Sequence, residues 1–164
     1  MNELEKDKNE IMSFLDEGKQ VLAILRGVSG CGKSTFAREL ITNHTTFSSS
    51  TVISADYYFL RPDGVYDWNP KFLANAHKWC FTEAENSMVK TQWGGSFDLV
   101  VLDNTNIARS QFKKYIDLAQ SNGYIIKEII VGSFDEESLK LYAKRNSHGV
   151  SLEAIKRMAS KFEE

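Results

Sequence analysis

A glycine-rich loop sets the strongest limit on what this chain of 164 residues folds into. Residues 27–34 read Gly-Val-Ser-Gly-Cys-Gly-Lys-Ser and fit the spacing G-x-x-x-x-G-K-[S/T] in full. Glycines let backbone N–H groups turn inward around a phosphate chain, and a following helix points its N-terminus at the same anions. The apolar run from Val21 to Leu25 precedes the loop and suits a buried parallel strand. The spacing and its flanks predict a nucleotide-binding α/β domain.

The loop motif predicts a role for each of its residues. Contact with the nucleotide is expected from the whole loop and the threonine after it: Gly27, Val28, Ser29, Gly30, Cys31, Gly32, Lys33, Ser34 and Thr35. Lys33 is expected to reach the β- and γ-phosphates of ATP, and Ser34 to ligate Mg²⁺. Cys31 either serves as a small residue in a place where Ser or Ala also fits, or has a thiol that the helix N-terminus makes reactive. The first interpretation is favoured.

Strands and helices alternate along the rest of the chain. Apolar runs predict strands at residues 21–25, 51–54, 99–102 and 124–131. Helical periodicity predicts helices over 3–18, from the loop to 41, from 70 to 88, over 107–119, from 133 to 146 and over 152–162. We expect Asn69, Ser133 and Ser151 to be N-caps. This alternation predicts an α/β, three-layer, kinase-like P-loop NTPase fold with a mostly parallel four-stranded sheet and a C-terminal helical lid.

The domain organisation expected is an N-terminal helical extension, residues 1–19, and a P-loop kinase domain, residues 20–164. Apolar residues make up 42% and charged residues 26%, as is ordinary for a globular protein. No apolar run approaches the ~20 residues of a membrane helix, and the charged first ten residues predict no secretion signal. We therefore expect a cytoplasmic protein with no membrane partner. The net charge of −2 disfavours coating of long nucleic acid by charge alone.

Two carboxylates follow strands whose carboxyl ends should meet beside the loop. Asp56 comes just after the second predicted strand, and Asp103 ends the third. Phosphoryl transfer needs a group that accepts the proton of the attacking hydroxyl, and Asp56 is the predicted base. Asp103 follows four apolar residues and resembles a Walker B acid that holds Mg²⁺ directly or through water. A cap or turn role is the alternative for each. Thr105 and Asn106 either cap the next helix or shape the acceptor site.

Other classes of nucleotide-binding protein fit less well. A GTPase needs an Asn-Lys-x-Asp segment and a D-x-x-G switch, and the sequence contains neither. Ring-forming ATPases are larger. A small domain of this size fits a nucleoside-triphosphate kinase.

Four segments in one order resemble the polynucleotide 5′-hydroxyl kinases. They are the phosphate loop, Ala55–Tyr58, Leu102–Asn106 and Ala143–Asn146. The resemblance covers roughly residues 20–162 and extends to a wider group of uncharacterised AAA-type P-loop kinase-like domains. It implies that Lys33 and Ser34 serve ATP and Mg²⁺, that Asp56 is the general base and that Asp103 is the second active-site acid. It makes Arg145 the lid arginine that grips the donor phosphates.

Departures from that family concern the acceptor. Phage kinases have two adjacent acids after the second strand, whereas this sequence has Tyr57 at the second position. The arginine expected three residues after the base is Phe59, with Arg61 two residues further on. That arginine helps to hold the acceptor in the family. No D-x-D-G-T motif is present, so 3′-phosphatase activity is not expected.

Arg145 also has a case that does not depend on the resemblance. It lies late on a predicted helix, before a segment interrupted by Gly149, which suits a mobile lid. Its planar guanidinium suits phosphate, and an arginine in cis can neutralise transition-state charge. Lys144 and Arg157 are weaker candidates for a functional role. We expect His148 to be a residue of the lid turn, and His44 and His77 to be structural.

These patterns predict an ATP- and Mg²⁺-dependent kinase whose leading acceptor is the 5′-hydroxyl end of a nucleic acid. Tyr57, Tyr58, Phe59 and Arg61 follow the base and would hold a short single-stranded end by stacking. We expect at least one of these aromatic rings to lie in the core. The alternatives are a kinase for a nucleoside, sugar or antibiotic, and a nucleotide-binding regulatory module without turnover.

Overall fold

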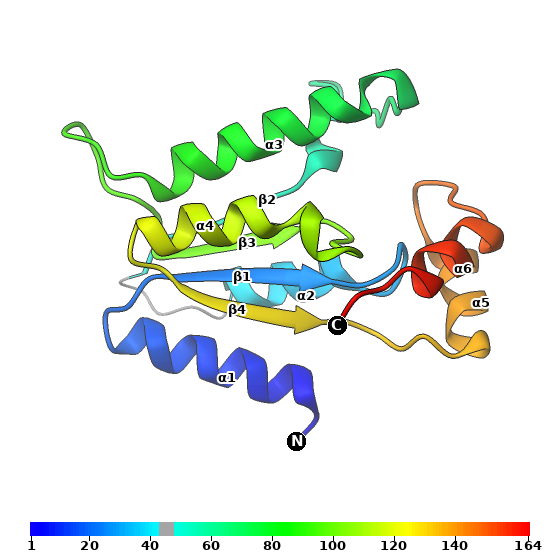
Figure 1. Ribbon diagram of the computed structural model, residues 1–164, viewed down its shortest axis with the longest axis horizontal. Coiled ribbons are helices and arrows are strands. Elements are labelled where there is room, and N and C mark those ends of the chain that lie inside the picture. The colour runs from blue at the N-terminus through cyan, green and yellow to red at the C-terminus, as the bar shows by residue number, and fades with distance from the viewer. Residues whose placement is uncertain (43–47) are drawn as a thin grey trace.

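A parallel sheet lies at the centre of the computed structural model, which describes residues 1–42 and 48–164 (Figure 1). Within these residues the sheet has four strands in the order β2-β3-β1-β4, and every pairing is parallel. The strands are β1 (Val21–Arg26), β2 (Ser50–Ile53), β3 (Leu99–Asp103) and β4 (Ile125–Ile130). Because the strands are parallel, all four carboxyl ends lie at one edge. The predicted four-stranded parallel sheet is confirmed.

Helices cover both faces of the sheet and its carboxyl edge. They are α1 (Glu3–Asp16), α2 (Lys33–Thr42), α3 (Leu73–Met88), α4 (Lys113–Ser121), α5 (Glu136–Arg145) and α6 (Leu152–Ser160). Figure 1 shows α3 and α4 on one side of the sheet, α1 on the other, and α5 and α6 beyond the strand ends. The fold is therefore the expected three-layer P-loop NTPase architecture. No helix in the described residues is long and apolar enough to cross a membrane.

The central strand β1 divides the core into two halves. All of its residues are buried, and successive side chains point to opposite faces, as in any strand. Val21 and Leu25 join the cluster under α1 and α2, whereas Leu22 and Ile24 join the cluster under α3 and α4. This two-sided burial explains why the sequence of β1 is apolar without alternation.

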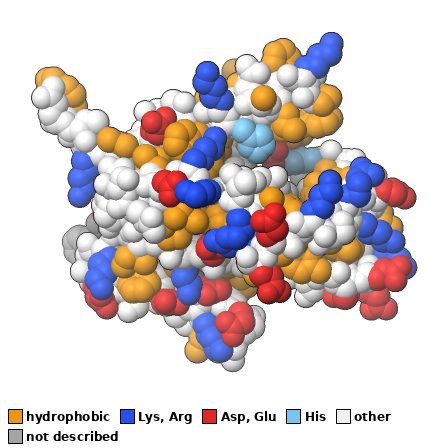
Figure 2. Space-filling model, in the orientation of Figure 1, with side chains coloured by type: hydrophobic (Ala, Val, Ile, Leu, Met, Phe, Trp, Pro, Cys, Tyr) orange, Lys and Arg blue, Asp and Glu red, His pale blue; other side chains and the backbone are white. Residues whose placement is uncertain are grey.

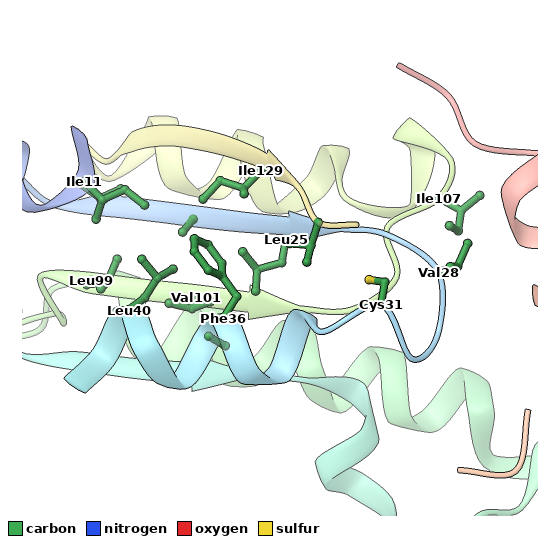
Figure 3. Close-up of a cluster of buried hydrophobic side chains, with 14 of the residues drawn as sticks. Ile11, Leu25, Val28, Cys31, Phe36, Leu40, Leu99, Val101, Ile107 and Ile129 are labelled. Carbon is green, nitrogen blue, oxygen red and sulfur yellow. The ribbon is translucent and has the colours of Figure 1, made fainter. Parts of the chain in front are cut away.

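Helix α1 contributes to the first half of the core. Ile11 is fully buried, and Figure 3 shows it in the same cluster as Phe36 of α2 and Ile129 of β4. Outside the core, Lys127 of β4 pairs with Asp7 at 3.2 Å and also with Glu10. The predicted amphipathic helix is thus present and packs on the edge strand. The boundary between extension and kinase domain stays a prediction.

Two predicted helix starts need correction. The helix expected from Pro70 begins with a 3₁₀ turn, η2 (Pro70–Phe72), before α3. Asn69 caps that turn as expected, because its side chain accepts from the Lys71 N–H at 3.0 Å. Phe72 and Leu73, at the start of the predicted helix, are 47% and 44% exposed. The helix expected from residue 107 also starts with a 3₁₀ turn, η3 (Arg109–Gln111), and α4 begins afterwards.

The predicted cap at Ser133 is wrong. Asp135 caps α5, since its Oδ1 accepts from the Ser138 N–H at 2.9 Å. The N–H of Ser133 donates instead to the Tyr142 hydroxyl, so Ser133 belongs to the connection from β4. The cap at Ser151 is confirmed, with the Ala154 N–H 3.2 Å from its hydroxyl.

A buried arginine ties the C-terminal residues to the end of β1. Arg26 is 1% exposed, and its Nε donates to the carbonyl of Asn106 at 3.0 Å. Its Nη2 donates to the carbonyl of Glu163. The guanidinium lies between the rings of Phe112 and Phe162, at 4.6 and 4.5 Å from their centroids. These contacts fix the end of the helical unit formed by α5 and α6 against the sheet.

Candidate active site

The phosphate loop connects β1 to α2 and is pressed against neighbouring backbone. A Cβ on Gly27 would lie 2.6 Å from the carbonyl oxygen of Val131, and one on Gly30 would lie 2.5 Å from that of Tyr142. Gly32 has a φ of +105°, a conformation that L side chains rarely adopt. Glycine is required here because the loop passes so close to the residues after β4 and to α5.

Lys33 is the first residue of α2 and lies inside the curve of the loop. Its side chain is 8% exposed, and its Nζ donates to the carbonyl of Val28 at 2.9 Å. Cys31 is 6% exposed, with its Sγ 3.6 Å from the same Nζ. A Cβ on Gly132 would lie 2.9 Å from the Cβ of Cys31. This crowding favours the reading of Cys31 as a small filling residue.

Ser34 and Asp103 meet at the head of the loop. The Ser34 hydroxyl donates to Oδ2 of Asp103 at 2.7 Å. Asp103 is 6% exposed, and burial raises the pKa of its carboxyl, while the Ser34 hydrogen bond and the Lys33 charge act to lower it. A hydroxyl beside a carboxylate is the oxygen donor set that Mg²⁺ takes alongside nucleotide phosphates. The pair fits that metal. In residues 1–42 and 48–164, no cluster of three His, Cys, Asp or Glu offers another metal site.

Asp56 lies in the short 3₁₀ helix η1 (Ala55–Phe59), directly after β2. The Ser54 side chain caps this turn by accepting from the Asp56 N–H at 3.2 Å. The Asn104 side chain accepts from the Ala55 N–H at 2.9 Å, which joins η1 to the end of β3. The Asp56 side chain is 52% exposed, so its carboxylate is open to a substrate. The local backbone is thus fixed by two side-chain caps while the carboxylate stays accessible.

Arg145 is the last residue of α5 and reaches back to the loop. Its Nε donates to the carbonyl of Gly30 at 2.8 Å. The guanidinium also packs on the Tyr142 ring, 5.0 Å from the centroid. One Nη lies 3.8 Å from where a Cβ on Gly32 would be. Arg145 therefore sits over the loop, where a phosphate chain would lie.

One cavity of about 700 Å³ brings the predicted site together. Its lining includes the following predicted residues: Ser29, Gly30, Cys31, Gly32, Lys33, Ser34, Thr35, Asp56, Asp103 and Arg145. Gly27 and Val28 belong to the loop but do not line the cavity. His148 lines it, whereas His77, Lys144 and Arg157 do not. The prediction for His44 lies outside the described residues.

Three lining or contacting residues escaped the sequence analysis. Arg38 lines the cavity, and it lies four residues after Ser34, so both occupy one face of α2. Asn104, directly after β3, accepts a hydrogen bond from the Ala55 N–H of η1. The Tyr66 hydroxyl donates to Oδ1 of Asp56 at 3.2 Å. Helical spacing was a usable signal for Arg38, but only tertiary contact reveals the other two.

The residues after Asp103 take different roles. Thr105 lines the cavity. Asn106 is 2% exposed with a φ of +47°, and its Nδ2 donates to the carbonyls of Leu25 and Asn104 at 2.8 and 3.2 Å. Asn106 therefore holds the turn after β3 and does not cap a helix. Of the two interpretations left open for Asn106, the helix cap is excluded.

The aromatic residues after Asp56 divide between core and surface. Phe59 is 5% exposed, which confirms that at least one ring lies in the core. Tyr57 and Tyr58 are 45% and 39% exposed. Arg61 pairs with Asp63 at 2.9 Å and does not line the cavity. Tyr57 and Tyr58 do not line the cavity either, so the cluster offers two exposed rings and an exposed, paired arginine next to the cavity-lining Asp56.

The loop, the paired Ser34 and Asp103, and the parallel sheet define the class of protein: a P-loop kinase-like domain that binds nucleotide. Residues 22–164 match a family described as an AAA domain, and the chain belongs to that family. It is 33% identical over 143 residues to NEDD4-binding protein 2 of Homo sapiens. That match covers 87% of this chain but 8% of the relative, so the chain spans a small part of the relative's length.

Solved structures with low sequence identity share the fold. The Pnkp1/Rnl/Hen1 RNA repair complex contains a chain that matches with a TM-score of 0.62 and 16% identity, over 87% of this chain and 44% of that one. Kti12 from Chaetomium thermophilum, in complex with ADP-AlF3, matches with a TM-score of 0.61 and 16% identity, over 87% and 80%. The AvrRxo1-ORF1:-ORF2 complex with ATP matches with a TM-score of 0.51 and 15% identity, over 89% and 48%.

Proposed function

We propose that this protein is an ATP- and Mg²⁺-dependent phosphotransferase whose acceptor is a hydroxyl group. The single observation that carries the proposal is the accessible carboxylate of Asp56 on the same cavity as Lys33, the Ser34–Asp103 pair and Arg145. A site that only holds nucleotide has no need of a second, exposed carboxylate opposite the phosphate loop. A base in that place serves transfer.

The residues on the donor side bind and orient the triphosphate. Backbone N–H groups of the loop and the Lys33 ammonium hold the phosphates, and the Arg145 guanidinium covers them from α5. Ser34 and Asp103 would hold Mg²⁺, which neutralises phosphate charge. Arg38, which shares the cavity, adds a cation to it. Asp56 then accepts the proton of the hydroxyl that attacks the γ-phosphorus, while ADP leaves with the bond electrons.

The 5′-hydroxyl end of a nucleic acid is our leading acceptor. Tyr57 and Tyr58 directly follow Asp56 and expose enough of their rings to stack on bases, an interaction worth roughly 1–3 kcal/mol per base. The shared fold with a chain of an RNA repair complex fits this acceptor. A cytoplasmic location and the absence of a membrane partner accompany the proposal, as expected from the sequence.

A small-molecule kinase is the second candidate, and a specific observation favours it. Phe59 occupies the position where the resembling family has an acceptor arginine, and its ring is buried. Arg61, the nearest arginine along the chain, is paired with Asp63. A non-catalytic nucleotide-binding module is the third candidate, and the accessible Asp56 counts against it.

The test is transfer of labelled γ-phosphate from ATP to a panel of acceptors. The panel contains 5′-hydroxyl DNA and RNA oligonucleotides, matched 5′-phosphorylated oligonucleotides, free nucleosides and sugars. We expect label on the 5′-hydroxyl oligonucleotides alone, with KM rising only modestly with salt because few phosphates are contacted. Label on a nucleoside or sugar, and none on oligonucleotides, would establish the second candidate. No transfer to any acceptor, with tight ATP binding, would favour the third.

A further inference from the structure

Two side chains from different parts of the chain, Tyr66 and His148, meet at the proposed base Asp56. The Tyr66 hydroxyl donates to Oδ1 of Asp56 at 3.2 Å, and Nδ1 of His148 lies 3.5 Å from Oδ2. The rings of Tyr66 and His148 stack, with centroids 4.2 Å apart and an angle of 9° between their planes. Each carboxylate oxygen therefore has its own neighbour, and the two neighbours support each other.

The segment that carries Tyr66 is itself held in place. Leu60 and Tyr66 form an isolated antiparallel bridge, and the Asp67 N–H donates to the carbonyl of Phe59 at 2.8 Å. The Tyr66 ring also meets the buried Phe59 ring edge-on at 6.2 Å. The hydroxyl is thus aimed at Asp56 by a small hairpin that returns to η1.

The segment that carries His148 is the connection between α5 and α6. Asn146 closes this connection, because its Oδ1 accepts from the Val150 N–H at 2.8 Å and its Nδ2 donates to the Val150 carbonyl at 2.9 Å. Arg145, three residues before His148, contacts the carbonyl of Gly30 in the phosphate loop. One short connection therefore reaches both the phosphate loop and the proposed base. Figure 2 shows histidine side chains beside the hollow between α3 and the unit formed by α5 and α6.

We propose that Tyr66 and His148 are positioning residues that hold the Asp56 carboxylate in the orientation needed to accept a proton, and that His148 couples this orientation to the α5–α6 connection. An exposed aspartate side chain on a short turn otherwise samples several rotamers. Two neighbours, one on each oxygen, select one rotamer. This inference rests on the proposed role of Asp56 as base.

The stacked rings link the Tyr66–Asp56 contact to the His148–Asp56 contact. Loss of the His148 ring leaves Tyr66 without its stacking partner, and loss of the Tyr66 ring removes the surface on which His148 lies. Hydrogen bonding and stacking can be separated by substitution. Tyr66→Phe removes the hydroxyl and keeps the stack, whereas His148→Gln keeps an N–H donor and removes the aromatic face.

The first experiment is a double-mutant cycle on phosphate transfer to the best acceptor of the panel. We expect Tyr66→Phe and His148→Ala each to lower kcat about 10-fold, the scale of one hydrogen bond to a charged group, with the KM for ATP unchanged. His148→Gln should recover part of that loss. In the Asp56→Asn background, where no base remains to be positioned, the same substitutions should change kcat less than 2-fold. Tyr124→Phe, at the opposite end of the sheet, is the control for loss of a tyrosine hydroxyl.

Each outcome separates this inference from the proposed function. If Asp56→Asn keeps wild-type transfer, the proposed base is wrong and the positioning role falls with it. If Asp56→Asn abolishes transfer while Tyr66→Phe and His148→Ala retain wild-type kcat, the base stands and the positioning role is overturned. Equal losses in the Asp56 and Asp56→Asn backgrounds would also overturn it, since they would show an effect that does not pass through the carboxylate.

A second measurement does not depend on turnover. The His148 ring protons lie over the Tyr66 ring, so their NMR resonances should carry a ring-current shift. We expect Tyr66→Leu to remove that shift and Asp56→Asn to move the same resonances by a smaller amount. The chain has only three histidines, which makes assignment by substitution simple. Unchanged His148 resonances in a folded Tyr66→Leu variant would overturn the inference.

Discussion

The two sides of the candidate active site are built in different ways. The proposed donor side consists of residues 27–35 with Asp103 and Arg145, and the proposed acceptor side consists of Asp56, Tyr66 and His148. On the donor side, Lys33 and Asp103 are 8% and 6% exposed; Lys33 bonds within the phosphate loop, and Asp103 of β3 bonds to Ser34 of α2. On the acceptor side, a half-exposed carboxylate is held by side chains 10 and 92 residues away along the chain.

This difference predicts that the two sides affect different properties, namely nucleotide affinity and phosphate transfer. Backbone geometry and buried neighbours leave the donor side little freedom, so it should bind nucleotide even when acceptor residues change. The acceptor side depends on exposed side chains, so single substitutions there should change transfer without changing nucleotide affinity. The predictions below test that separation, from the largest expected effect to the smallest.

Lys33→Ala should give the largest effect. Loss of the ammonium that faces the phosphates should weaken ATP binding and lower transfer by about 10³-fold, the upper scale for removal of one group that stabilises transition-state charge. Titration with a fluorescent ATP analogue and the transfer assay measure both quantities. Lys113→Ala, on the exposed surface of α4, is the control for loss of a positive charge. Wild-type binding and turnover in Lys33→Ala would show that the loop is misassigned.

Asp56→Asn should break the acceptor side alone. The amide keeps the shape of the carboxylate but cannot accept a proton, so transfer should fall by about 10²-fold. The affinity for ATP should stay at the wild-type value because the side chain lies outside the phosphate loop. Parallel losses of affinity and transfer would instead indicate a metal-binding or structural role.

Arg145→Lys should have an intermediate effect, because this residue is the link between the two sides. The charge stays, but the planar fork that bonds to the Gly30 carbonyl and covers the phosphates is lost. We expect transfer to fall by about 10-fold. In the wild type, proteolysis near residues 146–149 should slow when Mg-ATP is added, since this connection would close over the nucleotide. Cleavage at the same rate with and without nucleotide would contradict the lid role.

Asp103→Asn should have a small effect on the stability of the fold. We expect the variant to be more stable than the wild type, although loss of a proposed Mg²⁺ ligand should lower its activity. Burial raises the pKa of the Asp103 carboxyl, so between its ordinary pKa and the raised pKa the folded state binds more protons than the unfolded chain. Wild-type stability therefore gains as pH falls from neutral through the raised pKa, and near pH 7 the ionised carboxylate is unfavourable. The asparagine carries no charge to bury, so it should raise Tm at pH 7.

Thermal melts of Asp103→Asn and wild type between pH 7 and pH 4, without metal, measure this effect. The gap in Tm should narrow as pH falls, because the wild-type carboxyl becomes neutral as well. The Asn side chain can still accept the Ser34 hydrogen bond, so Ser34→Ala is the control for that contact. A lower Tm for Asp103→Asn at pH 7 would mean that the carboxylate stabilises the fold.

Sequence reasoning was most successful where contacts are local. The spacing from Gly27 to Ser34 predicted the phosphate loop, because the required backbone conformations depend on glycines at fixed positions. Apolar runs predicted all four strands to within a residue or two, since a strand buried on both faces needs a continuous apolar sequence. Asp56 and Asp103 were found because carboxyl ends of parallel strands share one edge.

Prediction from sequence failed where a second side chain or a different backbone group competed for the same hydrogen bond. Ser133 has the chemistry of a cap, but Asp135 lies where its carboxylate reaches the free N–H of Ser138. Asn106 also has the chemistry of a cap, but its amide is drawn to the carbonyls at the ends of β1 and β3. Propensity alone does not rank such alternatives, because each depends on which backbone groups the fold leaves open.

By itself, then, the sequence determined the fold class, the phosphate-loop motif and the two acidic residues that the structure places on the same cavity. Only the tertiary structure decided that Tyr66 and His148 meet at Asp56, that Phe59 is buried and that Arg38 faces the cavity. The physical reason is the separation along the chain between the residues that make each contact. A loop motif encodes contacts among neighbours in the chain, whereas the orientation of an exposed side chain depends on residues that the folding of the whole domain brings to it.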